Sequence, residues 1–191
     1  MSEERIERAR RVREFSIVRV LLGVLVAAVP LVVLLGPFSG SDHGPYWRRV
    51  KCLANLKGVS VYFALYAADH NDVYPTPERW CDLLVDMVRE DLGDPNGLEL
   101  LHRTLRCPSP RAPEGRCHFA MNPLADPNSA PDTVLLFESK PGWNQCGGPE
   151  LLTLENHDGQ GCSVLFVDYS LRFVQAREVA SLKWGQADES K

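Results

Sequence analysis

Several familiar catalytic and metal-binding motifs are absent from this sequence of 191 residues. It has no Cys-x-x-Cys pair, and only Cys117 neighbours a histidine, so a zinc ribbon, a thioredoxin-type redox site and a covalent haem site lack support. Neither Gly-x-Ser-x-Gly nor Ser-x-x-Lys occurs, and no cysteine has a catalytic signature. The sequence therefore predicts no enzyme activity, no catalytic residue, no resident cofactor and no metal site.

Excess positive charge is also missing from most of the chain. From Ser39 onward there are 15 lysines and arginines against 21 aspartates and glutamates. Without a basic stripe, nucleic acid is excluded as an expected partner. This part has roughly 150 residues, which is enough for one ordinary domain and too few for two.

Charge is absent altogether from residues 20–41. A bilayer core of about 30 Å needs roughly 20 apolar residues in a helix, so we expect a transmembrane helix at 20–38 with a kink at Pro30. The leader at 1–19 holds six arginines, which favour a cytoplasmic N-terminus. The sequence thus predicts a single-pass protein of the cytoplasmic (inner) membrane, with its C-terminal domain periplasmic or otherwise outside the cytoplasm.

Two other interpretations of the apolar run remain open. Ser39-Gly40-Ser41 offers a cleavage point for a secretory signal, but the leader is long and the apolar run exceeds the usual 7–15 residues of a signal core. A buried core helix of a soluble protein is disfavoured because such helices usually keep a polar face. The retained anchor and the cleaved signal both export everything after Ser41.

Six cysteines lie beyond the apolar run. In an oxidising compartment they predict up to three disulfides, for which 15 connectivities exist, and buried free thiols are the alternative. Their positions are 52, 81, 107, 117, 146 and 162.

Hydrophobic spacing predicts helices in the first half of the domain and strands in the second. A glycine- and proline-rich linker at 39–46 precedes a long amphipathic helix, and a polar tail follows the domain. The fold class we expect is α+β, with the transmembrane helix first and then the long helix packed on a small antiparallel sheet. We place the domain at 47–180, its helices at 47–70, 78–89 and 98–105, its strands at 133–137, 163–167 and 171–174, and the tail at 181–191.

Five segments, in this order, resemble bacterial pseudopilin-like proteins. In that family a type II secretion or type IV pilin-like N-terminal helix precedes a small exported domain that ends in a histidine, a glycine-rich turn and an Asp-Gly-His hairpin. The resemblance covers about two-thirds of the chain. Its segments are Cys52–Gly58, Tyr66–Pro75, Arg106–Ser109, Phe119–Pro123, and His157–Gly159 taken together with Val164–Asp168.

The chain departs from the family pattern at both ends. Glu14 and Arg19 stand where the family has the glycine and the glutamate of its prepilin cleavage motif, and Asp168-Tyr169-Ser170 replaces the Asp-Gly-His turn. The resemblance implies a membrane-anchored structural or accessory protein that contacts other pilin-like subunits or secreted proteins. Because the cleavage glutamate is missing, we do not expect assembly into an ordinary pilus.

The resemblance also implies particular residues. It favours a disulfide between Cys52 and Cys107, since both lie in matching segments. Members of the group hold calcium in a C-terminal loop, and Glu155, Asp158 and Asp168 are the oxygen donors there. Calcium is therefore an alternative to the absence of any cofactor.

An exported, membrane-tethered enzyme or ligand-binding domain is the alternative function. It would use a hairpin site of His157, Asp158 and Asp168, with the histidine as base and an aspartate orienting it. The structural interpretation, a histidine bonded to a loop backbone, is favoured because no nucleophile accompanies it.

Overall fold

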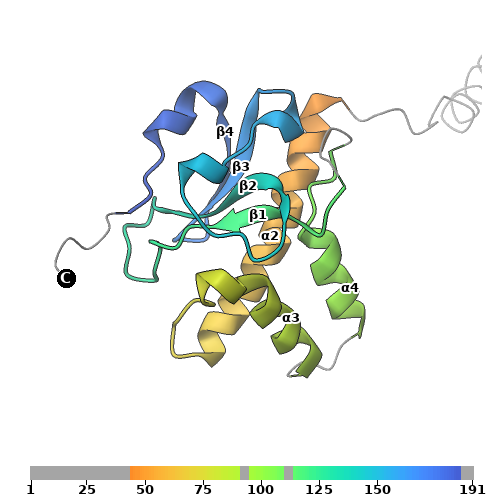
Figure 1. Cartoon of the computed structure of the whole chain (residues 1–191), viewed down its shortest axis with the longest axis vertical. Coiled ribbons are helices and arrows are strands. Elements are labelled where there is room, and N and C mark those ends of the chain that lie inside the picture. The colour runs from red at the N-terminus through yellow and green to blue at the C-terminus, as the bar shows by residue number, and fades with distance from the viewer. Residues whose placement is uncertain (1–43, 91–94, 110–113, 186–191) are drawn as a thin grey trace, which may run out of the picture. The chain divides into compact units, whose positions relative to one another are not determined.

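A computed structural model describes residues 44–90, 95–109 and 114–185, in which helices precede a four-stranded sheet (Figure 1). The helices are α2 (Pro45–Asp69), α3 (Trp80–Glu90) and α4 (Pro95–Thr104). The strands are β1 (Cys117–Met121), β2 (Val134–Gly142), β3 (Gly161–Phe166) and β4 (Leu171–Gln175). Short 3₁₀ helices are η1 (Pro77–Arg79), η2 (Pro149–Leu151), η3 (Glu155–His157) and η4 (Ala176–Ser181).

Helix α2 is the long amphipathic helix that the sequence predicts. Pro45 stands in its first turn, where a missing N–H costs nothing, and its buried face includes Cys52, Leu56 and Phe63 at helical spacing. After Asp69 the backbone takes positive φ angles at residues 71 and 72, which ends the helix. The buried face packs against β3 and β4, so α2 lies on one face of the sheet (Figure 1).

Helices α3 and α4 extend the same layer beside α2. Gly58 of α2 permits the close approach of α4, because a Cβ at this position would lie only 2.6 Å from Cγ2 of Thr104. The predicted helices at 78–89 and 98–105 are thus confirmed, each with shifted ends.

The sheet is an antiparallel meander in the order β1-β2-β3-β4. A register shift between Val134 and Leu136 puts Leu135 and Leu136 together in the helix-side core, while Phe137 faces the other side. Since strand side chains alternate, the next residue, Glu138, faces the helices. This alternation places a carboxylate in the core.

The second face of the sheet is covered by 3₁₀ helices and the C-terminal segment. Phe137, Val164 and Val174 form its core, against which Val179 and Trp184 pack. The domain boundary predicted at 180 therefore falls short, because Leu182 is buried and the ring of Trp184 meets Phe137 edge-on at 4.8 Å. Strand β1 is a further correction: the sequence predicts no strand before residue 133.

The expected fold class also needs a correction. The α+β domain is present, but within residues 44–90, 95–109 and 114–185 no helix combines the length and the apolar character that crossing a bilayer requires. Helix α2 is long enough, yet it carries Arg48, Arg49, Lys51 and Lys57. The predicted leader (1–19) and span (20–38), and most of the linker, lie outside the described residues.

Candidate functional site

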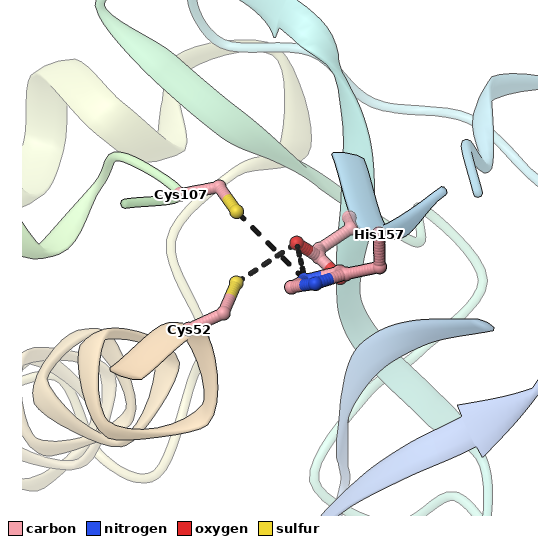
Figure 2. A group of neighbouring side chains, drawn as sticks. Cys52, Cys107 and His157 are labelled. Carbon is pink, nitrogen blue, oxygen red and sulfur yellow. Dashed lines mark hydrogen bonds and ion pairs between the residues drawn. The ribbon is translucent and has the colours of Figure 1, made fainter. Parts of the chain in front are cut away.

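Four potential metal-binding side chains meet in the core between α2 and the sheet. The ligand atoms of Cys52, Cys107, Glu138 and His157 all lie within 4.8 Å of one another. The Cys52 thiol donates to Oε1 of Glu138 at 2.8 Å, His157 Nε2 lies 3.1 Å from the same oxygen, and Cys107 Sγ lies 3.8 Å from His157 Nε2. In Figure 2 the Cys107 sulfur is directed at the imidazole, and the Cys52 sulfur is directed at the carboxylate oxygen beside it. We call these four residues the core cluster.

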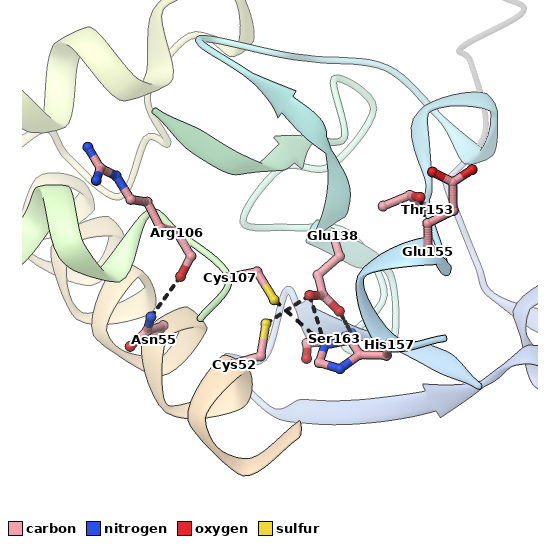
Figure 3. Close-up of polar contacts among 9 residues, drawn as sticks. All are labelled: Cys52, Asn55, Arg106, Cys107, Glu138, Thr153, Glu155, His157 and Ser163. Atoms are coloured by element: carbon pink, nitrogen blue, oxygen red, sulfur yellow. Dashed lines mark hydrogen bonds and ion pairs between the residues drawn. The ribbon is translucent and has the colours of Figure 1, made fainter. Parts of the chain in front are cut away.

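Each member of the core cluster comes from a different part of the fold (Figure 3). Cys52 is on α2, and Cys107 is on the segment that follows α4. One turn along α2 from Cys52, the Asn55 side chain donates to the Arg106 carbonyl at 2.7 Å, which holds Cys107 against the helix. This hydrogen bond, between residues near the two cysteines, fixes α2 and the segment after α4 to each other.

The other two members come from β2 and the η3 turn. The Thr153 amide donates to the Glu138 carbonyl at 3.0 Å, and the Thr153 hydroxyl accepts the Glu155 amide at 3.3 Å as η3 begins. This turn brings His157 beside Glu138. The His157 ring meets the ring of Phe173 edge-on at 5.2 Å, so packing fixes its orientation.

The Glu138 carboxylate is satisfied on both oxygens. Its Oε1 faces Cys52 and His157, and its Oε2 accepts the Ser163 amide of β3 at 2.6 Å. Exposed fractions of the four cluster residues are 0% for Cys52 and Glu138, 4% for His157 and 5% for Cys107. A buried carboxylate is stable only with such partners.

Charge in the core cluster is set by these contacts. Burial alone would raise the pKa of Glu138, but hydrogen bonds from His157, Cys52 and Ser163 bring that pKa below its ordinary value. Burial also opposes a charged His157, yet its contacts with Cys107 and Glu138 raise its pKa to about 9. Without a bound cation, the cluster therefore holds a carboxylate and an imidazolium at neutral pH.

The two thiols differ in acidity. Burial, followed by the hydrogen bond with Cys107, raises the pKa of Cys52 well above its ordinary value. The hydrogen bond with Cys52, together with that to His157, lowers the pKa of Cys107. Cys107 is therefore the more easily deprotonated sulfur, as a metal ligand or an attacking thiol must be.

The predicted hairpin residues do not gather around His157. Asp158 has a left-handed backbone with φ of 56° and pairs with Arg48 at 3.4 Å. Asp168 accepts the Ser170 amide at 2.9 Å within the β3–β4 turn. The partner of His157 is a glutamate, Glu138, rather than an aspartate.

The expected calcium donors are similarly apart. Glu155 is exposed and pairs with Lys140 at 3.5 Å. In the described ranges, the core cluster is the group of three or more possible ligands that lie together, and it includes none of Glu155, Asp158 and Asp168. The calcium hypothesis gains no support from this placement.

All six cysteines are free thiols in the structure. The resemblance suggests a disulfide between Cys52 and Cys107, and their sulfurs lie within 4.8 Å of each other. Because both are free thiols in the structure, their pairing stays a prediction. Cys81 and Cys117 form a second buried pair: burial, followed by the interaction with Cys117, raises the pKa of Cys81. The sequence did not predict that Cys81 and Cys117 would lie together.

Glu138 is the site residue that sequence reasoning missed. It directly follows the apolar run Val134–Phe137, and the strand predicted from the sequence stopped at residue 137. Period-two alternation could have identified it. If both faces of the sheet are covered, a charged residue that continues a buried strand must itself be buried on one of them.

Access to the core cluster limits its chemistry. Open depressions of about 380 and 300 Å³ on the described surface are lined by other residues. A substrate therefore has no route to His157 through either of them. The cluster is suited to holding the elements together, by hydrogen bonds or through an ion.

Comparisons with known proteins found no matching family model, no matching curated protein and no matching solved structure. The resemblance to pseudopilin-like proteins stays a prediction from the sequence.

Proposed function

We propose that this protein is a pseudopilin-like structural or accessory subunit that works through protein–protein contacts outside the cytoplasmic membrane. The long helix on a small antiparallel sheet supports the proposal, because it is the arrangement that the resemblance leads one to expect. The buried cluster supports it too, since its histidine is withdrawn from solvent. That burial speaks against the alternative, an enzyme or ligand-binding domain built on His157.

The outer face of α2 is the observation that carries the proposal. Trp47, Val61 and Leu65 are 53%, 50% and 41% exposed. Along α2, Trp47, Ala54, Val61 and Ala68 recur every seven residues and form one exposed stripe. The solvent face of a helix in a soluble domain is ordinarily polar, so an apolar stripe marks a surface that a partner covers.

The form of this stripe indicates which partner it fits. A seven-residue apolar repeat along a straight helix suits packing against another helix, and alanines permit close approach. Lys51 and Lys57 flank the stripe and favour acidic residues beside the partner's apolar face. We take the occupant to be an amphipathic helix of a second pilin-like subunit. An open depression of about 300 Å³ beside Val61 and Leu65, with Tyr169 at its edge, offers room for a side chain from that helix.

Site-specific photocrosslinking in cells tests the proposal. A photoreactive residue at Val61 or Leu65 should give a discrete crosslink to a pilin-like protein, identified by mass spectrometry. The matched control is Arg177 of η4, which is exposed on the side of the sheet away from α2 and should give none. Equal crosslinking at all three positions, or no crosslink at Val61 and Leu65, would overturn it.

A charge substitution gives an independent readout. Val61→Asp and Leu65→Asp should abolish the crosslinked complex formed elsewhere on α2 while leaving the circular dichroism spectrum unchanged, because both side chains are exposed. Arg177→Asp should leave the complex intact. Survival of the complex in both α2 variants would contradict a helix-to-helix contact.

A further inference from the structure

The core cluster has the composition and spacing of a metal site. In a tetrahedral site with metal–sulfur bonds of about 2.3 Å and metal–nitrogen or metal–oxygen bonds of about 2.0–2.2 Å, neighbouring ligand atoms are about 3.3–3.8 Å apart. In the cluster the Cys52–Glu138, His157–Glu138 and Cys107–His157 contacts measure 2.8, 3.1 and 3.8 Å, and no two ligand atoms are more than 4.8 Å apart. Shifts of less than about 1 Å, within reach of side-chain rotation, would complete the geometry.

We propose that Cys52, Cys107, Glu138 and His157 bind one zinc ion, which joins α2, the segment after α4, β2 and η3. The proposal is independent of the proposed function. Two sulfurs and an imidazole select zinc over calcium or magnesium, which prefer oxygen ligands alone.

Burial makes the site structural rather than catalytic. Structural zinc sites have four protein ligands and no open position, and all four cluster residues are at most 5% exposed. Ligands from four separate elements mean that the ion would contribute directly to folding.

The surroundings of the ligands also fit a metal site. The Ser163 amide holds the second oxygen of Glu138, and Phe173 packs on the His157 ring, so both ligands are oriented from outside. The guanidinium of Arg49 lies 4.7 Å above the same Phe173 ring. Two thiolates, a carboxylate and a neutral imidazole around a divalent ion leave one net negative charge, and this arginine is a nearby positive charge.

Metal content of the full chain is the first test. Protein purified in reducing buffer, exposed to zinc and freed of excess ion should contain one zinc per chain. Cys52→Ser, Cys107→Ser, Glu138→Ala and His157→Ala should each lose the ion to a competing chelator. His157→Cys should retain it, because sulfur replaces nitrogen as a ligand.

Matched controls come from the other cysteines. Cys146→Ser, at a partly buried position, and Cys162→Ala, at a buried one, should keep the full zinc content. An adventitious ion only, meaning zinc content unchanged by all four ligand substitutions, would overturn the proposal. So would wild-type protein that holds no zinc.

Two measurements use the wild-type chain alone, so their results do not depend on whether a variant folds. Cobalt(II) in place of zinc should give thiolate-to-cobalt charge-transfer absorption and intense visible bands typical of a tetrahedral ion. Alkylation mapped by mass spectrometry should find Cys52 and Cys107 protected with zinc and reactive after chelation, with the reactivity of Cys146 unchanged. A Cys52–Cys107 disulfide in protein isolated from native cells, or a cobalt spectrum without thiolate bands, would contradict the proposal.

Discussion

Replacing Glu138 by alanine should be one of the most destabilising single changes in this domain. The carboxylate is fully buried and contacts Cys52, His157 and the Ser163 amide at 2.8, 3.1 and 2.6 Å. Removing one partner of a buried ion pair costs about 3–5 kcal/mol, and an amide left unsatisfied about 1–3 kcal/mol. Because His157 can lose its proton once its partner is gone, we expect a total of about 3–5 kcal/mol.

Urea unfolding of the full chain, followed by circular dichroism with reductant and chelator present, measures this loss without any metal contribution. The matched control is Glu155→Ala. Glu155 and its partner Lys140 are both exposed, so this change should alter stability by no more than about 1 kcal/mol. The Glu138→Ala/His157→Ala double variant should lose less than the sum of the single losses, since the two residues interact directly. A loss below about 1 kcal/mol for Glu138→Ala would mean that the buried carboxylate does not stabilise the core.

Three further outcomes follow from other contacts. The Trp143 indole donates to Asp82 at 2.7 Å and lowers the pKa of that carboxyl below its ordinary value. The stability that this contact gives is present above the unfolded pKa and is lost as pH falls through the folded pKa. Acid titration of Trp143 fluorescence should therefore show a transition that Asp82→Asn removes. Gly58→Ala should destabilise the chain by about 1–3 kcal/mol in urea unfolding through its clash with Thr104, and adding Thr104→Ser should recover most of the loss. Trp184→Ala should cost about 2 kcal/mol by the same assay, less than a fully buried tryptophan, and no loss would mean that the C-terminal segment is not packed.

The helices and most of the sheet follow from local pattern. Helix α2 shows apolar residues at helical spacing and a clear end at residues 70–72, so its bounds differ by no more than two residues from those expected. Strand β1 was not predicted because its five residues stand between proline-rich stretches. All five are buried, so they show no alternation of polar and apolar residues. Its partner β2, which makes it a strand, lies more than ten residues further along the chain.

The site depends on contacts that no local pattern contains. Cys52 and His157 stood out through the resemblance, whereas Glu138 did not, because its role comes from the register of β2 and β3 and from the register shift at residues 134–136. Spacing rules for zinc ligands look for close pairs, and these four residues are spread over more than a hundred positions. Tertiary structure alone brings them together.

Zinc-edge X-ray absorption of the full chain, purified with reductant and loaded with one equivalent of zinc, tests the metal site most directly. We expect two sulfur ligands at about 2.3 Å and two nitrogen or oxygen ligands at about 2.0–2.2 Å. A first shell of oxygen and nitrogen alone would contradict it, as would failure of the chain to retain zinc.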